Sequence, residues 1–171
     1  HSVRQLMESG IQADVLVCRT EHVIPKEQRN KLAQFCNVAL ENVIECKDLE
    51  TIYEVPLYLQ KQDFDDVVLK ELNLKSDREA DLKDWKSFLK KYKNPKKSVE
   101  IALVGKYVSL QDSYKSIAEA FIHAGADLET EVKIRWVYSG ELDESNIEET
   151  FAGVDGILIA PGFGDRGIEG K

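Results

Sequence analysis

The chain has 171 residues, of which 43% are hydrophobic and 32% are charged, and its formal net charge is −8 at pH 7. This composition is that of a globular protein with a packed core, and it excludes a disordered or fibrous chain. The acidic balance argues against a nucleic-acid partner, and no apolar run approaches the roughly 18 residues of a membrane helix, so we expect a cytoplasmic protein without a membrane partner.

The three cysteines, Cys18, Cys36 and Cys46, lie beside apolar residues and lack CxxC spacing. An odd number without that spacing indicates neither a disulfide framework nor a zinc site. We expect buried, reduced thiols that act as small apolar side chains, with a nucleophilic role as the alternative.

The first part of the chain alternates short apolar segments with helical patterns, which is typical of α/β units around a parallel sheet. Strands are predicted at residues 14–18 and 43–46, and helices at residues 2–9, 26–35 and 51–74. Pro56 interrupts the last helical stretch. We expect the helix to end or kink there, because proline lacks an N–H and has a fixed φ.

A segment rich in Lys, Asp and Glu follows and predicts a helical linker, residues 75–98. Four of its apolar side chains share one helical face, and they are Leu82, Trp85, Phe88 and Leu89. The predicted domains are therefore residues 1–74 and 99–171, with the linker between them.

Beyond the linker, predicted strands and helices alternate as β-α-β-α-β. The strands fall at residues 99–104, 132–138 and 156–160, and the helices at residues 112–124 and 147–151. This order predicts a doubly wound parallel sheet, which usually has about five strands. Because fewer strands are predicted, we expect an α/β fold of two units with incomplete doubly wound parallel sheets, as part of a longer chain.

Polar residues follow the strand predicted at residues 99–104. Lys106 and Tyr107 come first, and residues 112–115 then open the next predicted helix. The carboxyl ends of parallel strands form the usual ligand crevice of an open α/β sheet. The alternative for Asp112 or Ser113 is a helix cap.

A glycine-rich loop after the last predicted strand is the strongest chemical motif. Its glycines are Gly162, Gly164, Gly167 and Gly170. Glycine permits positive φ and lets backbone N–H groups approach an anion closely, so the loop is a candidate oxyanion-binding loop. A plain glycine turn is the alternative.

Several segments, taken in order, resemble the CTP synthase family. The opening HSV, DVLVCR, P-x-x-x-R-x-K-x-A-x-F-C-N-V and VI-x-x-KD-x-x-x-IY-x-V-P are similar to the late amidoligase domain. VEIALVGKY, L-x-DSYKSI-x-EA and GFG-x-RG-x-EGK are similar to the start of its class I glutamine amidotransferase domain. The resemblance covers the chain from end to end.

This resemblance implies an activity in which ATP phosphorylates the uracil O4 of UTP, ammonia from glutamine displaces the phosphate, and CTP results. It also implies Mg²⁺ in the parent enzyme, GTP as an allosteric effector, and a homotetramer. The partners are then UTP, ATP, glutamine and the remaining segments of the parent chain.

The resemblance also implies site residues. Lys31 falls on the lysine that contacts UTP or CTP, and Gly162 falls on the glycine that contacts glutamine. Lys47, Asp48 and Leu49 fall on the segment that lines the adenine pocket for ATP. Without the family, Lys31 reads as an ordinary surface lysine and residues 47–49 read as an ordinary charged turn.

Further candidates have weaker support. Lys115 and Arg166 are possible effector or interdomain residues, and Arg19 and Arg29 are candidates for nucleotide or subunit contacts, with structural ion pairs as the alternative. We expect no metal ligand in this chain.

Other catalytic parts of such enzymes have no counterpart in the sequence. Class I amidotransferases use a cysteine in a G-x-C-x-G elbow together with a His and a Glu, and none of the three cysteines has that context. No phosphate loop is found either, so we expect the chain alone to be inactive. A stand-alone flavodoxin-like nucleotide-binding module and a hinge-like or polymer-forming structural role are the alternatives.

Overall fold

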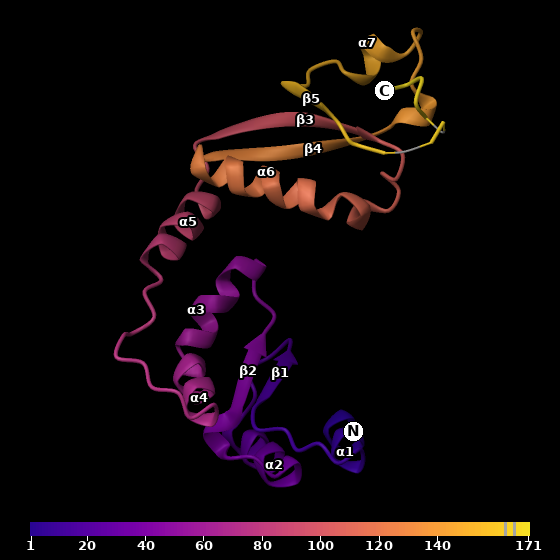
Figure 1. Ribbon diagram of the computed structural model, residues 1–171. Helices are drawn as coiled ribbons and strands as arrows, with labels where there is room; N and C mark the ends of the chain where they lie inside the picture. Colours follow the sequence, from indigo (N-terminus) through magenta and orange to yellow (C-terminus); the bar gives the residue numbers. More distant parts are fainter. Residues whose placement is uncertain (163, 166) are drawn as a thin grey trace. The chain divides into compact units, whose positions relative to one another are not determined.

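The computed structural model describes residues 1–162, 164–165 and 167–171, and the chain divides into two compact units, His1–Leu82 and Lys83–Lys171. Both units combine a small parallel sheet with helices (Figure 1). The predicted α/β class with two units is confirmed. None of the helices built from the described residues has the length and hydropathy to cross a bilayer.

The first unit contains a two-stranded parallel sheet, in which β1 (Leu16–Thr20) pairs with β2 (Val43–Lys47) from Leu16↔Val43 to Thr20↔Lys47. Its helices are α1 (Ser2–Glu8), α2 (Lys26–Cys36), α3 (Val55–Gln60) and α4 (Phe64–Glu71), with short 3-10 turns η1 (Leu40–Asn42) and η2 (Ile52–Glu54). Helix α2 is the crossover that two parallel strands require.

The core of this unit forms where α2 packs on the sheet. Leu16, Ala33 and Val43 are buried together, and half-buried apolar side chains from α1 and α2 surround them. Arg29 of α2 donates a hydrogen bond from Nη2 to the carbonyl of Val43. This bond ties the helix to the first residue of β2.

Pro56 behaves differently from the expectation. It lies in the first turn of α3, where a proline lacks no needed hydrogen bond and its fixed φ suits a helix. The helical stretch is broken further along, at Asp63, which has a left-handed φ of 54° just before α4. Pro56 therefore begins a helix rather than ending one.

Glu45 of β2 is a buried carboxylate that contacts α3. Glu45 of β2 accepts hydrogen bonds from the backbone N–H of Ile24 and from the hydroxyl of Tyr58. The side-chain amide of Gln62 pairs with the backbone of Glu45 at 3.0 and 2.7 Å. A buried carboxylate needs such partners, and these partners fix α3 and the loop before α2 to β2.

This arrangement predicts a pH effect on the first unit. The hydrogen bond to Glu45, helped by burial and by the charge of Glu45, raises the pKa of Tyr58 to about 12. Because an unperturbed tyrosine has a pKa of about 10, the fold favours the neutral phenol, and this stabilisation is present below pH ~10 and lost as the pH rises through ~12. Spectrophotometric titration of the native chain should show the late ionisation of Tyr58. Tyr58→Phe should remove that late step; a titration curve unchanged in the variant would contradict the assignment.

The second unit contains three parallel strands in the order β4-β3-β5. They are β3 (Lys97–Gly105), β4 (Thr130–Tyr138) and β5 (Gly156–Ile159). The connecting elements are α5 (Lys83–Lys93), η3 (Gln111–Tyr114), α6 (Lys115–Asp127), η4 (Ser139–Glu141) and α7 (Ile147–Thr150). β3 is central, in register with β4 from Lys97↔Thr130 to Gly105↔Tyr138 and with β5 from Ile101↔Gly156 to Val104↔Ile159.

The two faces of this sheet are covered by different helices (Figure 1). Leu103 packs with Tyr114 and Ala160 on the face that α6 covers, whereas Ala102 and Val104 pack on the opposite face with apolar residues around α7. Strand residues alternate between faces, so the continuous apolar run in β3 supplies both cores. The doubly wound arrangement expected for this unit is confirmed.

Arg135 of β4 joins three elements on the α7 side. Its guanidinium pairs with both carboxylate oxygens of Glu100 on β3, at 2.9 and 2.8 Å, and donates to the carbonyls of Thr150 and Ala152. The hydrogen bond to Arg135 lowers the pKa of Glu100. Planar guanidinium geometry suits such a fork, which links the end of α7 to two strands.

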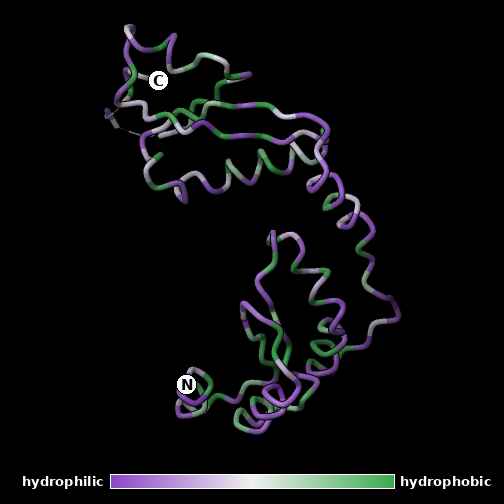
Figure 2. Tube along the Cα trace, turned by 180° about the vertical axis from the view of Figure 1, so that it is seen from behind, coloured by the Kyte–Doolittle hydropathy of each residue, from purple (hydrophilic) through white to green (hydrophobic). Residues whose placement is uncertain are grey.

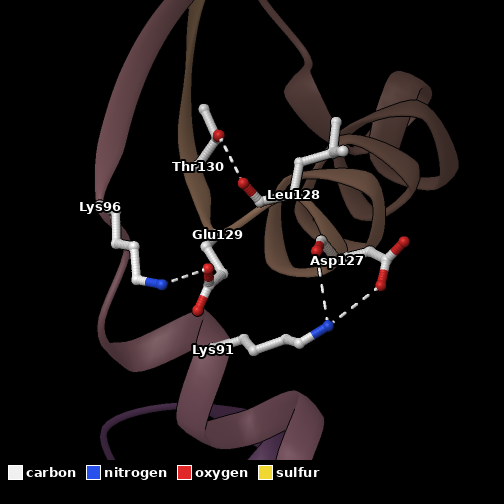
Figure 3. A network of polar contacts seen from close by, with 6 residues as sticks. All are labelled: Lys91, Lys96, Asp127, Leu128, Glu129 and Thr130. Carbon is white, nitrogen blue, oxygen red and sulfur yellow. Dashed lines mark hydrogen bonds and ion pairs between the residues drawn. The ribbon is translucent and has the colours of Figure 1, made fainter.

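Helix α5, expected within the linker, packs against α6 of the second unit. Phe88 contacts His123 edge-on, with ring centroids 5.8 Å apart. Lys91 donates to the backbone carbonyl and the carboxylate of Asp127 at the end of α6, where a cation also complements the helix dipole, and Lys96 pairs with Glu129 at 2.6 Å (Figure 3). We name this group of contacts the α5 clasp.

Hydrophilic residues dominate the connection between the last helix of the first unit and α5 (Figure 2). Residues 75–81 form no regular element and are all exposed. The amphipathic face predicted for the linker therefore packs within the second unit, as part of α5. The part of the predicted linker that precedes α5 is an exposed stretch without regular structure.

Candidate functional site

The carboxyl ends of β3 and β5 lie side by side in the second unit and form the base of the candidate site. β3 leads through the next turn to α6 on one face, while the chain reaches β5 after passing α7 on the other face. The crevice at such a switch in direction is where open α/β sheets bind ligands. Lys106 follows β3 there, and Ala160 follows β5.

Tyr114 shapes the turn that leaves β3. Its hydroxyl accepts hydrogen bonds from the backbone N–H groups of Lys106 at 2.9 Å and Tyr107 at 3.3 Å, and its ring is stacked on Trp136. A Cβ on Gly105 would lie 2.4 Å from the Tyr114 hydroxyl oxygen, so glycine is required there. The buried side chain of Tyr114 thus fills the space beside Gly105 and binds the backbone that follows β3.

Two lysines tie the glycine loop to the sheet. Lys106, only 5% exposed, donates from Nζ to the carbonyl of Gly164 at 2.7 Å. Lys171 donates from Nζ to the carbonyl of Ala160 at 2.8 Å. A Cβ on Gly162 would lie 3.2 Å from Lys171 Nζ and 3.6 Å from Lys106 Cε. Gly162 is therefore exposed but lies next to both lysine side chains.

The returning part of the loop lies on Ser139, at the carboxyl end of β4. A Cβ on Gly167 would approach Ser139 Oγ to 2.5 Å, and a Cβ on Gly170 would approach the Ser139 carbonyl oxygen to 1.9 Å. Gly164 and Gly167 have positive φ values of 80° and 67°. Ser139 is 1% exposed, and its Oγ has no hydrogen-bond partner within the described part of the chain.

The chemistry of this arrangement is that of a candidate anion site. Four glycines let the loop backbone come close to a ligand, and the ammonium groups of Lys106 and Lys171 lie beside it. Preorganised donors of this kind stabilise charge that develops on an oxygen during acyl transfer. The oxyanion-binding role predicted from the glycine pattern stays a prediction.

Other residues predicted near this site have mixed placements. Lys115 is the first residue of α6 and forms an exposed ion pair with Glu119 at 2.8 Å, which raises the pKa of Lys115. Asp112 and Ser113 make no capping hydrogen bond to α6 or η3. Arg166 lies outside the described residues.

The first-unit candidates gather partly at the carboxyl end of its sheet. Lys47 ends β2, and Asp48 donates its N–H to the Thr20 carbonyl at 2.7 Å. Arg19 pairs with the Asp48 carboxylate at 3.0 Å, and that hydrogen bond raises the pKa of the guanidinium. Leu49 is half-buried next to them. These neighbours form a polar strand end at which Arg19 and Asp48 are exposed and Lys47 is half-buried.

Lys31 and Arg29 lie on α2 with different surroundings. Lys31 is exposed and forms an ion pair one turn away with Glu27 at 2.9 Å. Arg29 is half-buried on the Val43 carbonyl, so a backbone hydrogen bond, not an ion pair, accounts for its contact. The structure thus leaves Lys31 accessible and gives Arg29 a structural contact.

The cysteines are free thiols, all half-buried rather than fully buried. Burial, followed by the charge of Cys36, raises the pKa of the Cys18 thiol. A raised pKa reduces the thiolate population, which argues against a nucleophilic role for Cys18. Among the residues that the structure describes, no three His, Cys, Asp or Glu side chains are grouped as a metal site.

Two family models match the chain. The model for the CTP synthase N-terminus matches residues 1–74, and the model for class-I glutamine amidotransferase matches residues 109–171. The whole chain aligns with CTP synthases of Cytophaga hutchinsonii at 58% identity, Flavobacterium johnsoniae at 56% and Caldanaerobacter subterraneus subsp. tengcongensis at 52%. The chain matches a fragment of a CTP synthase. It spans about a third, 32%, of the length of these relatives.

The two matched segments correspond to the two kinds of site. The polar strand end of the first unit lies in the part matched by the CTP synthase N-terminus, and the glycine loop lies in the part matched by the amidotransferase model. The motifs and the alignment over the full chain thus indicate the same family.

Three contributors to the CTP synthase glycine loop were missed by sequence reasoning. Lys171, Ser139 and Tyr114 were not singled out, although each contacts the loop or the strand end that supports it. Lys106 was noted for its place after a strand but not as a partner of the loop. The signal in the sequence was the position of Lys106, a charged residue directly after the apolar run of β3.

Proposed function

We propose that the chain is part of a CTP synthase that makes CTP from UTP by ATP-dependent amination with ammonia from glutamine, and that it works in the cytoplasm. The observation that supports this proposal most directly is the glycine loop at the strand ends of the second unit, where Lys106 and Lys171 bind the loop and lie next to Gly162. The family membership supports the substrates, since the relatives are CTP synthases.

The two units have different tasks in this proposal. In the first unit, Lys31 contacts the UTP or CTP nucleotide, and Lys47, Asp48 and Leu49 line the adenine pocket for ATP. The exposed side chain of Lys31 supports its assignment, because a cation there can reach a polyphosphate, and the partial exposure of residues 47–49 leaves that strand end within reach of a base. Mg²⁺ accompanies ATP in the parent enzyme, held by residues outside this chain.

In the second unit, Gly162 contacts glutamine while its amide is hydrolysed. A tetrahedral intermediate places negative charge on the former carbonyl oxygen, and the glycine loop supplies backbone donors for that charge. Lys115 and Arg166 are the proposed effector or interdomain residues for GTP. In a homotetrameric parent, residues 1–74 and 99–171 belong to the two enzyme domains, and residues 75–98 connect them.

A chimera tests the proposal. The chain replaces the matched 171-residue segment of the Cytophaga hutchinsonii CTP synthase, which is 58% identical. We expect UTP- and ATP-dependent CTP formation with either glutamine or ammonium chloride as the nitrogen source. A folded chimera that forms no CTP from either source would contradict the proposal. Nucleotide binding by the 171-residue chain without CTP formation by the chimera would instead favour the flavodoxin-like binding module.

A further inference from the structure

Lys106 is a buried lysine at a strand end. It follows directly on the apolar run of β3, is 5% exposed, and lies 58 residues before its loop partner. Burying an ammonium group is costly unless hydrogen bonds replace the lost water. The Lys106 ammonium replaces part of its lost hydration with a hydrogen bond to a carbonyl of the glycine loop. The free-energy cost of burying the ammonium therefore depends on the position of that loop.

The contacts of Lys106 divide between its stem and its head. The methylene stem lies against Gly162, with Cε 3.6 Å and Cδ 3.7 Å from the position of a Cβ there. The ammonium reaches Gly164 O at 2.7 Å. One side chain therefore contacts the loop at both its first and second glycine.

The hydrogen bond to Gly164 also sets the direction of a peptide group. In a trans peptide the C=O and the following N–H point in opposite directions. With the Gly164 carbonyl held towards Lys106, the N–H of Asp165 is directed away from Lys106. Gly164 has a φ of 80°, a conformation that glycine adopts without strain, so this orientation is available to the loop.

Apart from the contacts of Gly167 and Gly170 with Ser139, few interactions among the described residues position the loop. Within residues 160–171, the backbone hydrogen bonds among described residues are short-range turns from Ile168 to Asp165 and from Lys171 to Ile168. Lys106 and Lys171 supply side-chain hydrogen bonds between the loop and the ends of β3 and β5. Of the two lysines, only Lys106 comes from outside the loop.

We propose that Lys106 is a positioning residue: its ammonium holds the glycine loop in the orientation in which the loop binds the developing oxyanion of glutamine hydrolysis. This inference rests on the proposed function. The role is in positioning, because the ammonium acts through the Gly164 peptide.

The test uses Lys106→Met in the chimera, since methionine keeps an unbranched apolar stem and removes the ammonium. We expect kcat/KM for glutamine to fall about tenfold or more, because small displacements of catalytic groups are costly, while CTP formation from ammonium chloride stays unchanged. Lys106→Arg, which retains a donor, should recover part of the loss. Lys97→Met, at the exposed start of the same strand, is the matched control and should match the unsubstituted chimera.

A second readout is independent of activity. In the 171-residue chain, Lys106→Met should accelerate amide hydrogen exchange across residues 162–171, and Lys97→Met should not. An unchanged amide exchange rate in Lys106→Met would overturn the positioning role, and so would an unchanged kcat/KM for glutamine. An equal loss of CTP formation with glutamine and with ammonia would also overturn it. An unsubstituted chimera without glutamine-dependent turnover would count against the proposed function, while faster exchange in Lys106→Met would still support the positioning role.

Discussion

Gly170→Ala should reduce glutamine-dependent CTP formation of the chimera by about 100-fold, which is the effect of losing or displacing one oxyanion-stabilising donor. The added methyl group would lie 1.9 Å from the Ser139 carbonyl oxygen and 2.9 Å from its carbon. Ser139 is 1% exposed at the end of β4, so the backbone there cannot yield, and the loop must move instead. Activity with ammonium chloride should remain, because it bypasses glutamine hydrolysis.

Gly153→Ala is the matched control for this prediction. Gly153 has a φ of 77° and nothing within 4 Å of the position of its Cβ, so alanine there adds only backbone strain of about 1 kcal/mol. Steady-state rates with each nitrogen source separate the two variants. Gly170→Ala with full glutamine-dependent activity would mean that Gly170 does not seat the loop on Ser139 in the working enzyme.

Leu103→Ala should lower the free energy of unfolding of the second unit by about 2–5 kcal/mol, the usual cost of truncating a buried leucine. Leu103 is fully buried at the centre of β3, opposite Trp136 on β4 and Leu158 on β5. Its side chain packs with Tyr114, which supports the strand end below the glycine loop. The cavity left by the alanine would therefore weaken both the core and the packing of Tyr114 below the glycine loop.

Tryptophan fluorescence can follow this unfolding selectively. The chain has two tryptophans, Trp85 on α5 and Trp136 on β4, and both belong to the second unit. Denaturant titration should therefore report this unit alone. Ile157→Ala on β5, where the side chain is 53% exposed, is the control and should change stability by less than about 1 kcal/mol. Similar losses for both variants would argue against the central position of Leu103 in the core.

Sequence patterns located most elements because local chemistry determines them. The apolar run at residues 99–104 became β3, and the periodicity around Trp85 became α5. The pattern was ambiguous at Pro56, since proline both interrupts a helix and suits its first turn. It also could not show that α5 would pack on α6, because the partner of an amphipathic face is chosen by tertiary structure.

The glycine loop was visible in the sequence, but its supports were not. Glycine spacing indicates that a backbone must come close to something, without saying to what. Gly170 approaches Ser139 and Gly164 approaches Lys106 only because three strand ends meet at one edge of the sheet. The roles of Lys31 and of residues 47–49 rest on the family resemblance, and the chimera is suited to testing them by substitution.

The α5 clasp has a practical consequence for dividing the protein. An amidotransferase portion produced from the first strand onwards would omit Phe88 and Lys91, and would leave the α6 surface around His123 and Asp127 without its cover. A start at Lys83 keeps that cover, and it places the new terminus beside residues 75–81, which are exposed and form no regular element. Tags, protease sites and labels for either unit are best inserted in that short stretch, where the backbone has no packing to lose.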